Sequence, residues 1–120
     1  MRILDSNIII YASQTAYSYL LPLLHDSDSF VSEISKLEVL GYHKFDPIAK
    51  KTLTDLFDTI QIIPIDSTII NKAVQVRQNQ KMSLGDSIIA ATAVLNKLEV
   101  TTRNVNDFKA LNLVVNNPII

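Results

Sequence analysis

The chain has 120 residues, 48% of them apolar, which is the size and composition of one globular domain that can bury a core. Eleven lysine and arginine residues stand against twelve acidic ones, so the net charge of -1 excludes a protein that attracts nucleic acid through a global positive field. The lack of cysteine excludes disulfides and thiolate zinc sites, and no apolar run is long enough to cross a membrane. We therefore expect a single soluble, cytoplasmic domain spanning residues 1–120.

Short apolar runs alternate with stretches of helical spacing along the chain. In chain order the pattern predicts a strand at 2–4, a helix from 8 to 12, an apolar segment at 17–24, a strand at 30–31, a helix from 33 to about 42, a helix from 47 to 60, a strand at 61–65, a helix from 67 to about 78, a helix from 83 to 98, a strand at 99–102, a short helix at 104–111 and a strand at 113–115. Such alternation favours an α/β domain around a parallel sheet with helices on both faces.

Polar oxygen-bearing side chains stand beside several of these apolar elements. Asp5 separates RIL from IIIYA, Glu38 shares a helical face with small and apolar residues, and Asp86 opens the most apolar helix. Asn104 and Asp107 follow the strand EVTT. Parallel sheets bind ligands beyond the carboxyl ends of their strands, so we expect these side chains to converge there.

Each of these residues also has a local explanation. Asp5 is a suitable cap for the helix that follows it, and Glu38 fits a partly exposed helix position. Ser83 with Asp86 has the spacing of a capping box, and Asn104 with Asp107 repeats that spacing. Capping, however, does not require three carboxylates on core-facing positions at once.

Converging carboxylates raise one another's pKa values unless a cation neutralises them. Oxygen ligands without cysteine or a histidine pair favour Mg²⁺ or Mn²⁺, and His25 and His43 are expected at the surface or at helix ends. A divalent ion suits phosphodiester hydrolysis, because it lowers the pKa of an attacking water and stabilises the leaving oxygen. It also allows an acidic protein to hold an RNA backbone.

Four segments, in the order ILDSNIIIYA, VSEISKLEVLGY, SLGDSIIAATA and VTTRNVNDFKAL, resemble the PIN-domain ribonucleases, in particular the small VapC-type toxins of prokaryotic toxin-antitoxin pairs. The resemblance covers essentially the whole chain. It implies a three-layer α/β/α sandwich around a central parallel sheet and an endoribonuclease that uses Mg²⁺ or Mn²⁺. It also implies a homodimer and a VapB-like antitoxin that blocks the acidic pocket.

The resemblance also implies roles for individual residues. The catalytic acids would be Asp5, Glu38, Asp86 and Asp107, with Asn104 as an additional metal ligand. Ser6 matches the family's Ser or Thr beside the first aspartate, which can hydrogen-bond a ligand or a metal-bound water. Many members have an aspartate where Asn104 stands, so the missing charge predicts a second metal site weaker than the first.

Two surfaces could serve partners. An RNA track is predicted at Lys36, Lys44, Lys50, Lys51 and Arg103. An apolar groove for an antitoxin helix is predicted at Tyr11, Tyr17, Tyr19, Leu20 and Leu21. A solvated helix face remains the alternative for Lys50 and Lys51, and core packing the alternative for at least half of the groove.

Two other functions fit the sequence. A PIN-like module that has lost catalysis and binds RNA or protein is indicated by Asn104. An aspartyl-phosphate enzyme or receiver domain would use Asp5 as its nucleophile. A dehalogenase-like site needs a second aspartate where Asn7 stands, however, and a receiver needs an additional acidic pair that the N-terminus lacks.

Overall fold

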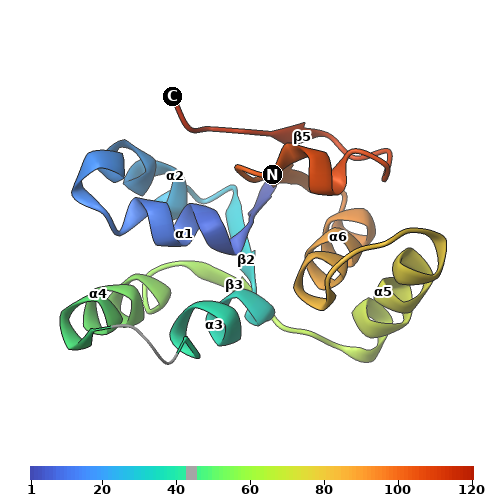
Figure 1. Cartoon of the computed structure of the whole chain (residues 1–120), viewed down its shortest axis with the longest axis horizontal. Coiled ribbons are helices and arrows are strands. Elements are labelled where there is room, and N and C mark those ends of the chain that lie inside the picture. The colour runs from blue at the N-terminus through green and yellow to red at the C-terminus, as the bar shows by residue number, and fades with distance from the viewer. Residues whose placement is uncertain (43–45) are drawn as a thin grey trace.

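The computed structural model describes residues 1–42 and 46–120 (Figure 1). Its strands form one parallel sheet in the order β3-β2-β1-β4-β5. They are β1 (Arg2–Leu4), β2 (Ser29–Ser32), β3 (Gln61–Ile63), β4 (Glu99–Thr101) and β5 (Val115–Asn116). The predicted parallel sheet is confirmed.

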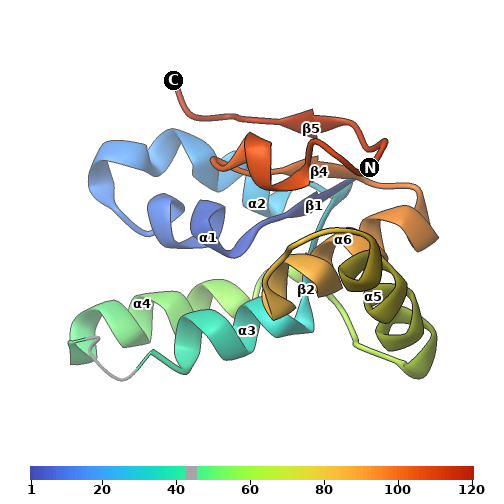
Figure 2. The same cartoon turned by 45° about the vertical axis from the view of Figure 1, so that its right-hand side comes forward.

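Helices connect consecutive strands and cover the sheet. Within the described residues they are α1 (Ser6–Ala12), the 3₁₀ segment η1 (Thr15–Leu20), α2 (Leu21–His25), α3 (Glu33–Leu40), α4 (Pro47–Phe57), α5 (Ser67–Asn79), α6 (Leu84–Asn96) and the 3₁₀ segment η2 (Val105–Phe108). Figures 1 and 2 place α1, α2 and α4 on one side of β1 and β2, and α5 and α6 on the other. This arrangement is the predicted three-layer α/β/α sandwich.

The two halves of the core follow from the alternation of side chains along the strands. Leu4 and Val31 point into the cluster made with α1, α2 and α4. Ile3 and Val100 point the other way, into the cluster made with α6 and η2. Helix α6 buries most of its surface, as its composition predicts. The parallel sheet is thus covered on both faces, and only its strand ends are left for polar chemistry.

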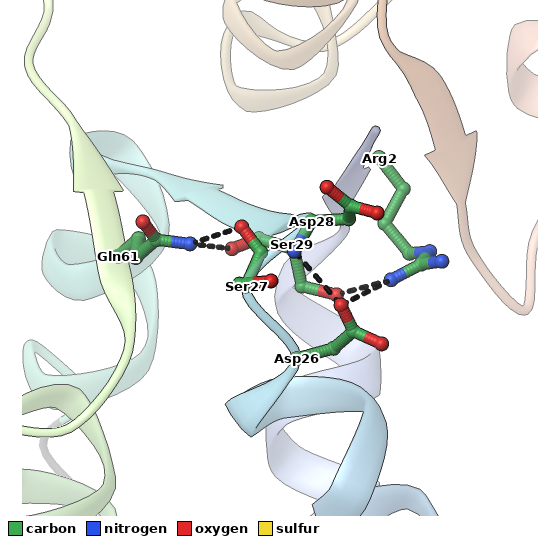
Figure 3. Close-up of polar contacts among 6 residues, drawn as sticks. All are labelled: Arg2, Asp26, Ser27, Asp28, Ser29 and Gln61. Carbon is green, nitrogen blue, oxygen red and sulfur yellow. Dashed lines mark hydrogen bonds and ion pairs between the residues drawn. The ribbon is translucent and has the colours of Figure 1, made fainter.

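The amino ends of the central strands are joined by polar contacts (Figure 3). The guanidinium of Arg2 donates to Ser29 Oγ at 2.8 Å and lies 3.8 Å from the Asp26 carboxylate. The Gln61 amide donates to the carbonyls of Ser27 and Ser29 at 2.8 and 3.0 Å. These contacts link β1, β2 and β3 at the end opposite to the predicted acidic site.

Several element boundaries differ from the prediction. Helix α1 begins at Ser6 rather than Ile8, because the Asp5 side chain accepts a hydrogen bond from the Ser6 amide. Only Val105–Phe108 of the predicted helix at 104–111 is helical, as a 3₁₀ segment. Strand β5 begins at Val115, since Asn112 has a φ of 40° and the chain reaches β4 only where Val114 accepts from Val100.

Two residues named in the sequence analysis, His43 and Lys44, lie outside the described residues. Among the helices of the described ranges, none combines the length and the apolar character needed to span a bilayer. His25 is exposed at the end of α2, where its ring lies 2.9 Å from Thr59 Oγ1, and this agrees with its predicted helix-end position.

Candidate active site

Asp5 lies at the carboxyl end of β1 and is only 7% exposed. Both carboxylate oxygens are hydrogen-bonded: one accepts from the Ser6 amide at 2.7 Å and the other from Thr102 Oγ1 at 2.8 Å. Asp5 therefore caps α1, as the local explanation proposed, and it also projects from a strand end. The capping role and the position beyond a strand end, which the sequence analysis considered separately, are both found for Asp5.

Thr102 is a positioning residue that the sequence analysis missed. It is fully buried, it follows β4 directly, and its hydroxyl donates to Asp5 while accepting from the Asn104 amide at 3.0 Å. Strands β1 and β4 are neighbours with Leu4 opposite Thr101, which brings the residues after both strands together. Only the pairing of these two strands, separated by most of the chain, reveals this contact.

Glu38 lies on α3, which follows β2 and is capped by Ser32. Its carboxylate accepts a hydrogen bond from Ser6 Oγ at 2.9 Å, and the same hydroxyl is hydrogen-bonded to Ser35 Oγ at 2.9 Å. The prediction that Glu38 faces the core is wrong: Ser35 and Val39 take the buried face of α3, and Glu38 is exposed. Its carboxylate lies instead between Ser6 and the first turn of α6.

Asp86 lies in that first turn of α6 and is half-buried. Ser83 caps the helix by accepting from the Asp86 amide at 3.1 Å, so the predicted capping role is also real. Asp86 and Asp107 line a common cavity of about 610 Å³, whose wall also includes Arg77 and Lys81. Asp107 is exposed, so among the predicted acids only Asp5 is buried.

The acids act on one another electrostatically. Burial, together with the charges of Asp5 and Asp107 and against the lowering effect of the Ser83 hydrogen bond, raises the pKa of Asp86 from its usual 3.8 to about 6. Burial also raises the pKa of Asp5. The hydrogen bonds from Thr102 and Ser6 lower this pKa, and the charges of Glu38 and Asp107 raise it. Four segments therefore bring mutually repelling carboxylates to one region.

The donor chemistry of this region fits a hard divalent cation, because every acidic group offers oxygen and each would be relieved of repulsion by a positive charge. In residues 1–42 and 46–120, no three histidine or acidic side chains are already arranged around a single point as metal ligands. Repulsion between the carboxylates opposes their closing on a single point until a cation neutralises it. Of the predicted acids, Glu38 and Asp107 are exposed to solvent.

Asn104 is exposed and its side chain makes no capping hydrogen bond, although its carbonyl accepts from the Asp107 amide at 3.0 Å. Together with Asp107, Arg103 and Lys109 it lines a cavity of about 590 Å³. The structure thus keeps Asn104 next to Asp107 at the edge of the acidic region.

The basic side chains near the acids are only partly those predicted from the sequence. Lys51 lies 3.3 Å from Asp55 on the exposed face of α4, which favours the solvated-face alternative for this residue. Arg103 lies over the Tyr11 ring at 5.5 Å and lines the same cavity as Asp107. Arg77 and Lys81, which the sequence analysis did not select, line the cavity of Asp86. Arg77 and Lys81 lie near Asp86 because α5 packs against α6. No local sequence pattern indicates that packing.

The residues of the predicted apolar groove lie partly in the core and partly at the surface. Leu20 is buried in the core and offers no surface. Tyr11 and Tyr17 form an edge-to-face pair with centroids 4.7 Å apart, and Tyr19 is exposed, with its hydroxyl accepting from the Ile120 amide at 3.1 Å. Core packing therefore explains part of the set, as its alternative proposed, and Tyr19 remains at the surface.

Comparison with known proteins identifies the family. The profile of the PIN domain matches residues 2–112. The chain belongs to the PIN domain family. A sequence comparison with curated proteins found no match.

Solved structures of this PIN domain's relatives share its whole architecture. A chain of the toxin-antitoxin complex from Klebsiella pneumoniae is 30% identical with a TM-score of 0.79, over 99% of this chain and 98% of that one. FitAcB from Neisseria gonorrhoeae is 26% identical with a TM-score of 0.80, over 98% of each chain. VapBC2 from Rickettsia felis, bound to a promoter DNA fragment, is 21% identical with a TM-score of 0.78 over 97% of each chain, and at this identity it supports the fold alone.

Proposed function

We propose that this PIN domain is the toxin of a VapBC-type toxin-antitoxin pair and an endoribonuclease that hydrolyses RNA phosphodiester bonds with Mg²⁺ or Mn²⁺. The observation that carries the proposal is the electrostatic coupling of acids from four separate segments beyond the strand ends. The charges that raise the pKa values of Asp5 and Asp86 cost folding stability, and such clusters are typical of functional sites. Membership of a family whose domains are generally nucleases supports the same function.

In this proposal Asp5, Glu38 and Asp86 hold the principal ion, and Asp107 with Asn104 completes the site directly or through water. When bound, a divalent cation makes a water more acidic and stabilises negative charge on the leaving oxygen. The chain's own residues fix the ligands. Thr102 orients one oxygen of Asp5, and Ser6 orients one oxygen of Glu38.

Partners are proposed on the same basis. Arg77, Lys81 and Arg103 line the cavities of the acids and could contact RNA phosphates on either side of the cleaved bond. A VapB-like antitoxin is supported by the similarity to a toxin-antitoxin complex at 30% identity. We also propose a homodimer and a cytoplasmic location.

A second function, a PIN-like module that binds RNA or protein with weakened catalysis, is favoured by one observation. The side chain at position 104 is an amide, so the exposed edge of the site has one charge fewer than in many members of the family. An ion at that edge would be held by Asp107 with less electrostatic attraction.

RNA cleavage in the presence of Mg²⁺ or Mn²⁺ tests both functions. Wild type would be compared with Asp5→Asn and Asp86→Asn, with EDTA as the metal control. Asp46→Asn is the matched control variant, because Asp46 caps α4 and does not act on either acid. We expect wild type and Asp46→Asn to cleave and the two site variants to lose at least roughly 100-fold in rate. Equal cleavage by all four would contradict the site, and RNA binding without cleavage by folded wild type would favour the binding module.

A further inference from the structure

Gly85 is one of only two glycines in the chain, and it lies in the first turn of α6. Its backbone does not require glycine, because no described glycine has a positive φ. Glycine is also a poor helix former, so alanine would be favoured at this position on propensity alone. The reason for a glycine must lie in the space around it.

That space is filled by the Glu38 carboxylate. A Cβ atom at position 85 would lie 2.5 Å from Glu38 Oε2 and 2.9 Å from both Cδ and Oε1. These separations are too short for non-bonded atoms, so the carboxylate would have to move. Glu38 is an exposed, flexible side chain, so it can move without disturbing the core.

Movement of the carboxylate is opposed from its other side. Ser6 Oγ donates to Glu38 Oε1 at 2.9 Å and is itself hydrogen-bonded to the buried Ser35 at 2.9 Å. The carboxylate is thus held between the hydroxyl of Ser6 on α1 and the bare backbone of Gly85 on α6. A methyl group at position 85 would push it out of this arrangement.

We infer that Gly85 is a positioning residue for Glu38: its missing side chain allows the Glu38 carboxylate to lie against α6 in the turn that carries Asp86. The inference rests on the proposed nuclease function for its effect on activity. The contact between Gly85 and Glu38 can be tested without it.

The test is a double-mutant cycle on the full chain with wild type, Gly85→Ala, Glu38→Ala and the double variant. Three quantities are measured: the thermal midpoint in EDTA, the affinity for Mn²⁺ and the steady-state RNA cleavage. In the Glu38→Ala background the added methyl meets no carboxylate, so we expect Gly85→Ala to raise Tm by roughly 2–5 °C through helix propensity. With Glu38 present the rise should be smaller or absent.

For activity, we expect Gly85→Ala alone to lower kcat by roughly 10- to 100-fold, as a small misplacement of a catalytic group does, with little change in KM for RNA. Its Mn²⁺ affinity should fall, and the same substitution should have no effect on that affinity once Glu38 is alanine. Equal Tm shifts in both backgrounds would overturn the inference. Unchanged Mn²⁺ affinity and cleavage in a Gly85→Ala protein, beside an active wild type, would also overturn it.

The two proposals fail in distinguishable ways. A wild type that neither binds Mn²⁺ nor cleaves RNA would contradict the nuclease function, and the Tm cycle in EDTA would still decide whether Gly85 makes room for Glu38. An active wild type with additive Tm shifts would leave the nuclease function intact and refute the role of Gly85.

Discussion

Replacing Asp86 with asparagine is expected to stabilise the metal-free protein near neutral pH and to abolish ion binding. The pKa of Asp86 is raised to about 6 by burial and by the charges of Asp5 and Asp107. The folded protein therefore binds a proton at Asp86 more tightly than the unfolded chain does. Above pH 7 the side chain is ionised in both states, and the folded state bears the cost of the charge.

The size of the effect follows from that pKa. A rise from 3.8 to about 6 corresponds to at most about 3 kcal/mol, and solvent screening at a half-buried side chain reduces this to about 1–2 kcal/mol. Asparagine removes the charge and keeps an oxygen that can still meet Ser83. The gain should therefore be absent below about pH 4, grow between pH 4 and 6, and stay constant above pH 7.

Urea unfolding in EDTA at a series of pH values measures this gain. With a typical slope of roughly 2 kcal/mol per molar urea, the midpoint of Asp86→Asn should rise by about 0.5–1 M at pH 7.5. Asp66→Asn is the matched control, because Asp66 caps α5 and is not among the charges that raise the pKa of Asp86. Added Mn²⁺ should stabilise wild type and leave Asp86→Asn unchanged.

The reasoning would be refuted by an Asp86→Asn protein that is less stable than wild type at pH 7.5 by the same amount as at pH 4. That result would mean that Asp86 acts only as a capping group. A gain at pH 7.5 that persists unchanged at low pH would point to better packing of the amide and would equally contradict the electrostatic explanation.

Further outcomes are expected elsewhere in the site. Thr102→Val should lower stability by about 2 kcal/mol, more than Thr92→Val, because it leaves one buried oxygen of Asp5 and the Asn104 amide without a partner, whereas Thr92 donates only to a helix carbonyl. In wild type the hydrogen bond from Thr102 lowers the pKa of Asp5, so its loss should raise that pKa. Thr102→Val should therefore also weaken Mn²⁺ binding more at pH 6 than at pH 8. Arg77→Ala and Lys81→Ala should each reduce the slope of log K for RNA binding against log salt by about one phosphate contact. Lys51→Ala, whose side chain is paired with Asp55, should leave that slope unchanged. Equal slopes for all three variants would contradict RNA binding in the cavity of Asp86.

The order of the main elements could be predicted from sequence because they have a local apolar pattern, and because capping side chains precede α1, α3, α4, α5 and α6. The convergence of Asp5 with Asp86 followed from a general rule about strand ends in parallel sheets. Thr102 and Gly85 were missed because their roles depend on partners far away in the chain. A threonine after a strand and a glycine in a helix have no distinguishing pattern until Asp5 and Glu38 are placed beside them.

The exposure of Glu38 was mispredicted for a related reason. An acid among apolar neighbours on one helical face suggests burial, but the turn of α3 that faces the core is set by Ser35 and Val39. Glu38 lies at the margin of that face, where it reaches Ser6 and remains open to solvent. The proposed RNA substrate would need this accessibility. The misprediction concerned the exposure of Glu38, and its predicted position near the other acids is unaffected.

Capping is compatible with the proposed ion binding at this site, and the caps help to explain how the acids fold together without a cation. Asp5 caps α1, Asp86 lies in the first turn of α6, and the Glu38 carboxylate lies against that same turn. The amino end of a helix carries partial positive charge, worth roughly 0.3–1 kcal/mol to each nearby carboxylate. These helix ends offset part of the repulsion that raises the pKa values of Asp5 and Asp86. The fold can therefore hold an acidic cluster and remain stable in the absence of the proposed divalent ion.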